Sequence, residues 1–343
     1  MREKKERFGI GKRKIVTAVW LVLASGFLIL GGCTRKEART EGKEGEEPLK
    51  VITTLFPYYD FTRQIAGDMV DLELIIPAGM DSHSFEPTPA DMRKIQGADV
   101  LICNGGAMEH WVSEVLEAID RTDMTVVVMM DYVEAVEEEI VEGMEEETHD
   151  HSHKEHQDED SVLEDRDHEE EKEYDEHIWT SPVNAMTFTK VIANALSEAD
   201  PAHKKEYEAG KDRYEKELLR LHEGFQEVAG SRGQTTIVIG DKFPFRYLAD
   251  EYGFQYYAAF SGCSTDTEPS AKTIAYLIHK VREENIPVVY YLELSSHRVS
   301  EIISEETGAK LKLLHSCHNV TRRELEDGVT YVELMEQNIE NLR

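Results

Sequence analysis

The chain has 343 residues, with 69 acidic and 38 basic side chains and a formal net charge of −31 at pH 7. An acidic balance of this size makes nucleic acid an unsuitable partner, because binding phosphates requires a basic surface. The length is sufficient for two ordinary domains.

Residues 1–33 have the features of an export signal. A basic segment (2–14) precedes a sixteen-residue apolar run (15–30), and two glycines lead to Cys33. This order predicts a bacterial lipoprotein signal, cleaved before Cys33 and acylated on its thiol, which would attach the protein to the membrane by a lipid anchor. The alternative is a transmembrane anchor, for which the run is slightly short. Both interpretations place the protein outside the cytoplasm, and residues 34–48, rich in Lys, Glu and Gly, then form a flexible tether.

Eight short apolar runs predict two sets of strands. Several are continuously apolar rather than alternating, as expected of parallel strands that are covered on both faces. The expected strands are 49–53, 71–76, 99–103 and 125–130 in the first half, and 235–240, 254–258, 287–292 and 310–314 in the second.

Within 134–176 lies a strongly acidic segment that also carries histidines. It holds twenty-two acidic residues, three basic residues and five histidines, which are His149, His151, His153, His156 and His168. Imidazoles and carboxylates together would gather divalent cations loosely and in large number. The alternative interpretation is a disordered acidic linker that happens to contain histidines.

After this segment a long helix is predicted. Beyond Pro201, a stripe at helical spacing contains Tyr207, Tyr214, Leu218, Leu221 and Phe225, and Gly230 with Gly233 ends it. The expected fold class is therefore α/β, with two lobes, each a parallel sheet flanked by helices, joined by one long rigid helix. The N-terminal lobe covers 49–184, the linking helices 185–233 and the C-terminal lobe 234–343.

Metal-binding side chains follow four of the predicted strands. His83 lies beyond the second strand, Asp241 follows the fifth, Glu293 the seventh and His315 the eighth. Ligands of open α/β sheets gather at the carboxyl ends of strands, so these side chains are expected to meet. His177, directly after the acidic segment, adds a fifth candidate.

Motifs along the whole mature chain resemble one family, the solute-binding lipoproteins of zinc and manganese ABC importers, also called cluster A-I or zinc-uptake binding proteins. The resemblance rests on Thr54-Leu-Phe-Pro57-Tyr-Tyr-Asp60, Ile76-Pro-Ala-Gly79 with His83 and Glu86-Pro-Thr-Pro89, Glu109-His-Trp111, and Asp175-Glu-His177-Ile-Trp179. It implies two lobes with a metal site between them.

The resemblance assigns His83 and His177 to the first two ligand positions. At the third position, where the family usually has histidine, this chain has Lys242, with Asp241 beside it. His315 is the nearest equivalent of the fourth ligand, with His318 as a credible substitute, and Glu293 matches an acidic residue at the end of the preceding strand. The expected site is therefore His83, His177 and His315 with a carboxylate from Glu293 or Asp241.

The resemblance also implies a function. The protein would capture Zn²⁺ and deliver it to an ABC permease and its ATPase, acting as a monomer on the outer face of the membrane. Three imidazoles and a carboxylate favour Zn²⁺ over Mn²⁺, which prefers oxygen ligands. The alternatives are a surface adhesin, a metal-buffering lipoprotein or a manganese binder of the same fold. An enzyme is not expected, because the sequence has no His-Glu-x-x-His motif or nucleophile elbow.

Three cysteines remain besides Cys33. Cys103 lies in an apolar strand, so a disulfide, if one forms, is expected between Cys263 and Cys317. If Cys317 stays free, its thiolate is a further candidate ligand.

Overall fold

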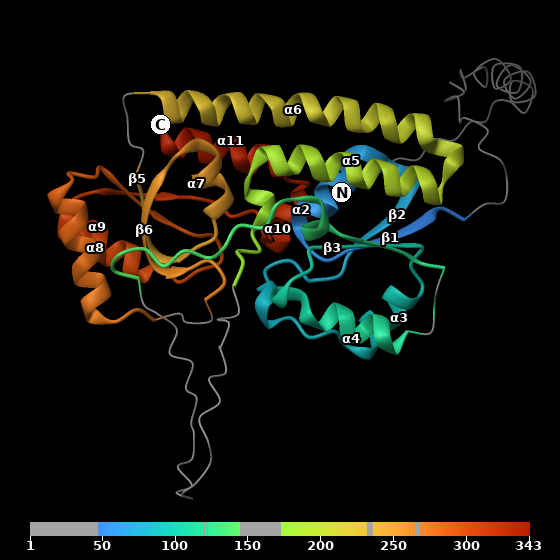
Figure 1. Ribbon diagram of the computed structural model, residues 1–343, viewed down its shortest axis with the longest axis horizontal. Coiled ribbons are helices and arrows are strands. Elements are labelled where there is room, and N and C mark those ends of the chain that lie inside the picture. The colour runs from blue at the N-terminus through green and yellow to red at the C-terminus, as the bar shows by residue number, and fades with distance from the viewer. Residues whose placement is uncertain (1–46, 120, 122, 145–172, 232–235, 265–267) are drawn as a thin grey trace, which may run out of the picture. The chain divides into compact units, whose positions relative to one another are not determined.

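The computed structural model describes residues 47–119, 121, 123–144, 173–231, 236–264 and 268–343. Residues 48–343 form one compact unit, which contains two four-stranded parallel sheets (Figure 1). The predicted signal and most of the tether lie outside the described residues. None of the helices in the described ranges is both long and apolar enough to cross a bilayer.

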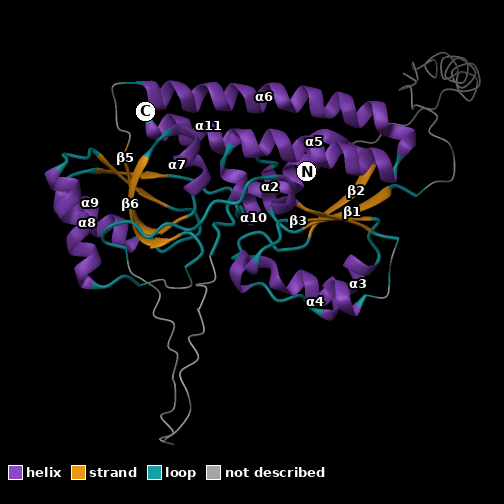
Figure 2. Ribbon diagram, in the orientation of Figure 1, coloured by secondary structure: helices purple, strands orange, loops and turns teal. Residues whose placement is uncertain are grey.

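The N-terminal lobe has the strand order β2-β1-β3-β4, all parallel. The strands are β1 (Leu49–Thr53), β2 (Val70–Leu74), β3 (Val100–Cys103) and β4 (Thr125–Val128). Helices α2 (Phe56–Ala66) and α5 (Pro182–Ala199) lie on one side of this sheet, and α3 (Pro89–Gln96) and α4 (His110–Ala118) on the other (Figure 2).

The C-terminal lobe repeats this plan with the order β6-β5-β7-β8. Its strands are β5 (Thr236–Phe243), β6 (Gln255–Ser261), β7 (Val288–Tyr291) and β8 (Lys310–Leu313). Its helices are α7 (Arg246–Tyr252), α8 (Ala271–Glu283), α9 (Arg298–Thr307), α10 (Arg322–Asp327) and α11 (Tyr331–Leu342). All eight predicted strands are present, which confirms the predicted fold class.

Strand β5 shows why its apolar run is continuous. Ile237 and Ile239 belong to the large core that extends through both lobes, whereas Val238 belongs to a second core with Leu277 of α8 and Ile303 of α9. Both faces of the sheet are thus covered by apolar side chains, as parallel sheets require.

Helix α6 (Lys204–Gly230) is the predicted linking helix. It packs on α5 and α2 of the N-terminal lobe and on α11 and α7 of the C-terminal lobe, running along both (Figure 1). The five predicted stripe residues are all buried. At 1.5 Å per residue, its 27 residues span about 40 Å.

A buried carboxylate strengthens this connection. Asp60 of α2 is fully buried and accepts hydrogen bonds from the Tyr214 hydroxyl of α6 at 3.0 Å and the Tyr331 amide of α11 at 2.8 Å. Arg63, paired with Asp60, also donates to the Val329 carbonyl at 2.6 Å. One carboxylate thus serves helices of both lobes, an arrangement that favours small relative shifts over a large hinge closure.

Candidate metal site

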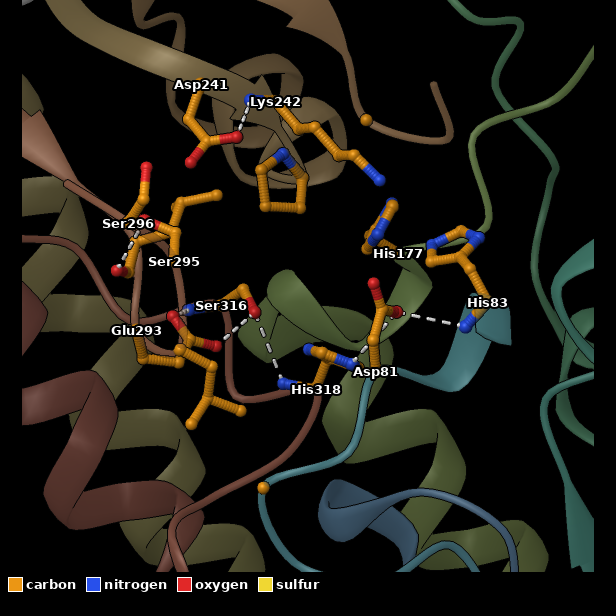
Figure 3. A pocket seen from close by; sticks show the side chains of 15 residues that line it. Asp81, His83, His177, Asp241, Lys242, Glu293, Ser295, Ser296, Ser316 and His318 are labelled. Carbon is orange, nitrogen blue, oxygen red and sulfur yellow. Dashed lines mark hydrogen bonds and ion pairs between the residues drawn. The ribbon is translucent and has the colours of Figure 1, made fainter. Parts of the chain in front are cut away.

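A cavity of about 380 Å³ lies between the lobes, at the carboxyl ends of strands from both sheets (Figure 3). The loop after β2 and the segment after the acidic run line one side, and the ends of β5, β6, β7 and β8 line the other. The lining residues are Gly79, Asp81, His83, His177, Asp241, Lys242, Pro244, Gly262, Leu292, Glu293, Leu294, Ser295, Ser296, Ser316 and His318. Four of the five predicted ligands are therefore brought to one cavity.

His83 is held by a short 3₁₀ turn (Ser82–Ser84). The side chain of Asp81 caps the turn, and its Oδ1 accepts a hydrogen bond from the His83 amide at 3.0 Å. Burial and the neighbouring His177 lower the pKa of His83 to about 3. The imidazole is therefore neutral at physiological pH and has a lone pair for a cation.

His177 faces His83 across a ring-centroid distance of 5.9 Å. The fully buried Asp175 accepts the His177 amide at 2.7 Å, and the same oxygen lies 3.2 Å from Nδ1. Since an ionised carboxylate only accepts hydrogen bonds, this contact places the proton on Nδ1 and leaves the lone pair on Nε2. Burial by itself would lower the pKa of His177, but the Asp175 charge outweighs it and raises the pKa.

His318 reaches the same cavity from the C-terminal lobe. Its Nε2 lies 3.9 Å from Asp81 Oδ1 and accepts the Ser82 amide at 3.4 Å, so it contacts the loop that carries His83. Burial lowers the pKa of His318, although the negative charges of Glu293 and Asp81 act to raise it. In Asp81, burial would raise the pKa, but the His318 charge and the His83 amide outweigh it and lower the pKa.

The structure does not bring His315 into the lining of the cavity. His315 lies outside the cavity lining; its Nδ1 accepts the Cys317 amide at 2.9 Å and lies 3.4 Å from Glu293 Oε1. The intervening Cys317 has a φ of 63°, in the left-handed region, which turns the chain so that His318 faces the cavity. From the sequence, His315 was the expected ligand, and His318, three residues later, was its substitute.

Glu293 lines the cavity, but both of its oxygens are engaged. Oε2 accepts the Ser316 amide at 2.8 Å and Oε1 accepts the Ser316 hydroxyl, which in turn accepts the His318 amide at 3.3 Å. Glu293 thus orders the loop that presents His318.

Asp241 lies on the far side of the cavity from His83 (Figure 3). The expectation that Asp241 follows the strand is wrong, because β5 continues through a register shift to Phe243. Asp241 Oδ1 accepts the amide of Lys242 at 2.8 Å. The Lys242 side chain points toward His177 (Figure 3).

The candidate ligands line one cavity without forming a closed shell. Among the residues that the structure describes, no group of three His, Cys, Asp or Glu side chains is close enough to hold a metal ion. Capture of an ion at this cavity would therefore draw these side chains closer together.

The predicted disulfide is not formed. Cys263 and Cys317 are both free thiols, as is Cys103. Cys317 is fully buried beneath the His318 loop with its Sγ toward the His315 carbonyl, whereas the Cys263 amide donates to Glu138 at 2.9 Å. The two cysteines thus belong to different parts of the lobe. Cys33 and the five histidines of the acidic segment lie outside the described residues.

The two described ends of the acidic segment are attached directly behind His177. They pair through an antiparallel bridge between Glu137 and Tyr174. The Tyr247 hydroxyl of α7 donates to the Asp175 carbonyl at 2.9 Å and accepts the Val136 amide at 3.1 Å. Sequence patterns did not predict this clamp, because it joins residues more than seventy positions apart.

Comparison with known proteins assigns the chain to a family. Residues 51–343 match the family described as zinc-uptake complex component A, periplasmic. The high-affinity zinc uptake system protein ZnuA of Bacillus subtilis is 31% identical over 322 residues, 94% of this chain and 95% of that protein. The zinc-binding lipoprotein AdcA of Streptococcus pneumoniae is 32% identical over 302 residues, 88% of this chain and 56% of its own length.

Solved structures agree with this assignment. The Zn(II)-bound ZnuA-like domain of Streptococcus pneumoniae AdcA aligns with a TM-score of 0.67 at 29% identity, covering 86% of this chain and 98% of the domain. The metal-dependent lipoprotein YcdH of Bacillus subtilis aligns with a TM-score of 0.68 at 28% identity, covering 86% of this chain and 98% of that structure. This chain therefore belongs to the zinc-uptake complex component A family.

Proposed function

We propose that this protein captures Zn²⁺ between its two lobes, on the outer face of the membrane, and delivers it to an ABC permease and its ATPase. The observation that carries the proposal is that His83, His177, His318 and Asp81 all line one interlobe cavity. Lipid attachment at Cys33 and action as a monomer complete the proposal.

The chemistry of this donor set favours zinc. Zinc prefers four ligands in tetrahedral geometry and binds both imidazole nitrogen and carboxylate oxygen. Manganese stands lowest in the divalent affinity order and prefers oxygen ligands, so three imidazoles disfavour it. Asp175, which contacts Nδ1 of His177, supports this assignment, because a histidine that binds a metal through one nitrogen is usually oriented by a partner on the other.

The ligand set that we propose differs from the one expected from sequence. His318 takes the place of His315, and Asp81 takes the place of Asp241 or Glu293. Asp81 Oδ1 lies 3.9 Å from His318 Nε2 and accepts the His83 amide, while Glu293 is engaged by Ser316. His83 and Asp81 come from the N-terminal lobe and His318 from the C-terminal lobe. An ion bound by all of them draws the lobes slightly together.

This closure would signal the loaded state to the permease. Helix α6 and the Asp60 network limit the movement to small shifts, so a loaded and an empty form differ mainly around the cavity. In this proposal the histidines of the acidic segment raise the local concentration of Zn²⁺ without forming part of the tight site.

The test is calorimetric titration of Zn²⁺, and separately of Mn²⁺, into the protein from residue 34 onward. We expect one tight zinc site that His83→Ala and His177→Ala each abolish, with weaker binding of manganese. His279→Ala, an exposed histidine on α8, is the matched control and leaves the site intact. Tight zinc binding that survives both cavity substitutions would place the site elsewhere and refute the proposal.

Transport and attachment need separate tests. Cells that lack the protein should lose uptake of labelled zinc at low external concentration and regain it with the wild-type chain. A Cys33→Ser chain is expected in the medium rather than in the membrane fraction. Normal uptake in the deletion strain would favour buffering or adhesion over import.

A further inference from the structure

His83 and His177 already lie close to the spacing that a shared ion needs. Their ring centroids are 5.9 Å apart, and the two rings lie side by side at the cavity (Figure 3). Two imidazoles on one tetrahedral zinc, each with its nitrogen about 2.0–2.1 Å from the ion, have centroids about 5 Å apart. The two histidines belong to separate turns that are distant in the chain. A third segment therefore has to fix the spacing between them.

That segment is the 3₁₀ turn Ala107–Glu109, which leads directly into α4. Glu176, the residue before His177, places its carboxylate at the N-terminal end of this turn. Its Oε2 accepts the Met108 amide at 2.6 Å, and its Oε1 accepts the Ala107 amide. His177 is thereby attached to the turn through the residue beside it.

The same segment also supports the turn that carries His83. Ser82, the buried first residue of that turn, donates its hydroxyl to the Met108 sulfur at 3.0 Å. Phe85, which directly follows the turn, packs edge-on against Trp111 of α4 with ring centroids 5.1 Å apart. Both ends of the His83 turn therefore rest on the segment to which the His177 segment is attached.

The local structure is shaped to receive the Glu176 carboxylate. Gly106, which precedes the turn, has a φ of 80°, and a Cβ at this position would collide with the carboxylate carbon and both oxygens of Glu176. The first amides of a helical turn have no partner within it, so the buried carboxylate satisfies groups that would otherwise be left without hydrogen bonds. A glutamine would keep one acceptor oxygen but would present a second donor to the other amide.

We propose that Glu176 is a positioning residue for zinc capture: its carboxylate attaches His177 to the turn that also supports His83, and so holds both imidazoles near the spacing of a shared ion before the ion binds. This inference rests on the proposed function and deepens it. Glu176 lies outside the cavity lining, so it acts through His177 and not as a ligand. Ligands that are ordered in advance lower the entropic cost of binding.

Zinc titration and the visible spectrum of bound Co²⁺ provide the test, using the protein from residue 34 at pH 8. We expect Glu176→Gln to weaken zinc binding about tenfold or more, as the loss of a residue that orients a metal ligand usually does. The absorption of four-coordinate Co²⁺, measured at saturation, should also weaken or shift. Glu176→Asp keeps both acceptor oxygens on a shorter side chain, so its zinc affinity should fall between those of wild type and Glu176→Gln.

Glu109→Gln is the matched control. Glu109 is also buried and also accepts two backbone amides at the same turn, those of Asn104 at 2.7 Å and Gly105 at 3.0 Å, but these amides do not belong to a segment that carries a ligand. This variant should bind zinc and Co²⁺ as wild type does. Thermal unfolding without metal compares the stability of all the variants.

Two outcomes would overturn the inference. One is zinc affinity within about twofold of wild type in Glu176→Gln and Glu176→Asp, with an unchanged Co²⁺ spectrum, even if the melting temperature falls. The other is an equal loss in Glu109→Gln, which would assign the effect to the general order of the turn. In both cases the proposed function still stands if His83→Ala abolishes zinc binding. Wild-type protein that binds no zinc would contradict the proposed function itself.

Discussion

Replacing Asp175 by Asn tests whether this buried carboxylate orients His177 for zinc. Oδ1 of Asp175 accepts the His177 amide at 2.7 Å and lies 3.2 Å from Nδ1, so it fixes both the position and the tautomer of the ring. Loss of such a partner usually lowers metal affinity about 10- to 100-fold, or about 1.4–2.7 kcal/mol. We expect this loss for Asp175→Asn at pH 8.

The effect of Asp175→Asn on zinc affinity should depend on pH. Asp175 raises the pKa of His177 above its ordinary value of 6.5, and zinc must displace the bound proton. Wild-type affinity therefore falls as the pH drops through that raised pKa, by up to about tenfold per pH unit. The substitution removes the carboxylate charge and lowers the pKa, so its affinity begins to fall at a more acidic pH. The ratio of wild-type to variant affinity should shrink on acidification.

A competition titration with a zinc-binding dye between pH 5.5 and 8 measures this ratio. Asp71→Asn, an exposed aspartate on β2, is the matched control and should bind zinc as wild type does at every pH. Thermal unfolding without metal separates a folding defect from a change of site. If Asp175→Asn binds zinc within about twofold of wild type across the range, His177 is oriented by something other than Asp175.

Three further substitutions probe the clamp, the helix packing and a buried acid. Tyr247→Phe leaves two backbone groups without partners and should lower the free energy of unfolding by about 1–3 kcal/mol, measured by urea denaturation. Gly210→Ala places a methyl group 2.1 Å from the Ile65 carbonyl oxygen. Overpacking should cost about 1–3 kcal/mol of stability, more than the gain of about 1 kcal/mol in helix propensity. An unchanged or higher melting temperature would contradict this packing. Burial raises the pKa of Glu109 from 4.5 to about 7, so the folded state holds this proton more tightly than the unfolded state does. The free energy of unfolding should therefore fall by up to about 3 kcal/mol as the pH rises from 4.5 to 7. Denaturation of Glu109→Gln across that range should lack this contribution, and a slope identical to wild type would assign the pH dependence to other groups.

The elements of the fold were largely readable from the sequence. Continuous apolar runs such as Ile237-Val238-Ile239 predicted parallel strands covered on both faces, and the two cores on either side of β5 explain why the pattern is reliable. The stripe of α6 was equally informative, because a long amphipathic helix must bury one face. His83 and His177 were found because each lies in a local motif.

The remainder of the site depended on tertiary structure. From the sequence, His315 was the expected ligand and His318 its substitute. In the structure His318 lines the cavity and His315 does not, and Cys317 between them has a left-handed φ. Glu293, one of the two carboxylates expected at the site, lines the cavity and accepts two hydrogen bonds from Ser316, a contact between residues twenty-three positions apart.

The extension of β5 to Phe243 and the free thiols of Cys263 and Cys317 were likewise not readable from the sequence. A residue's type and neighbours along the chain determine whether it is buried and in which element it lies. The direction of a side chain at a loop, and the partner that engages it, are determined by segments that meet only when the two lobes fold together.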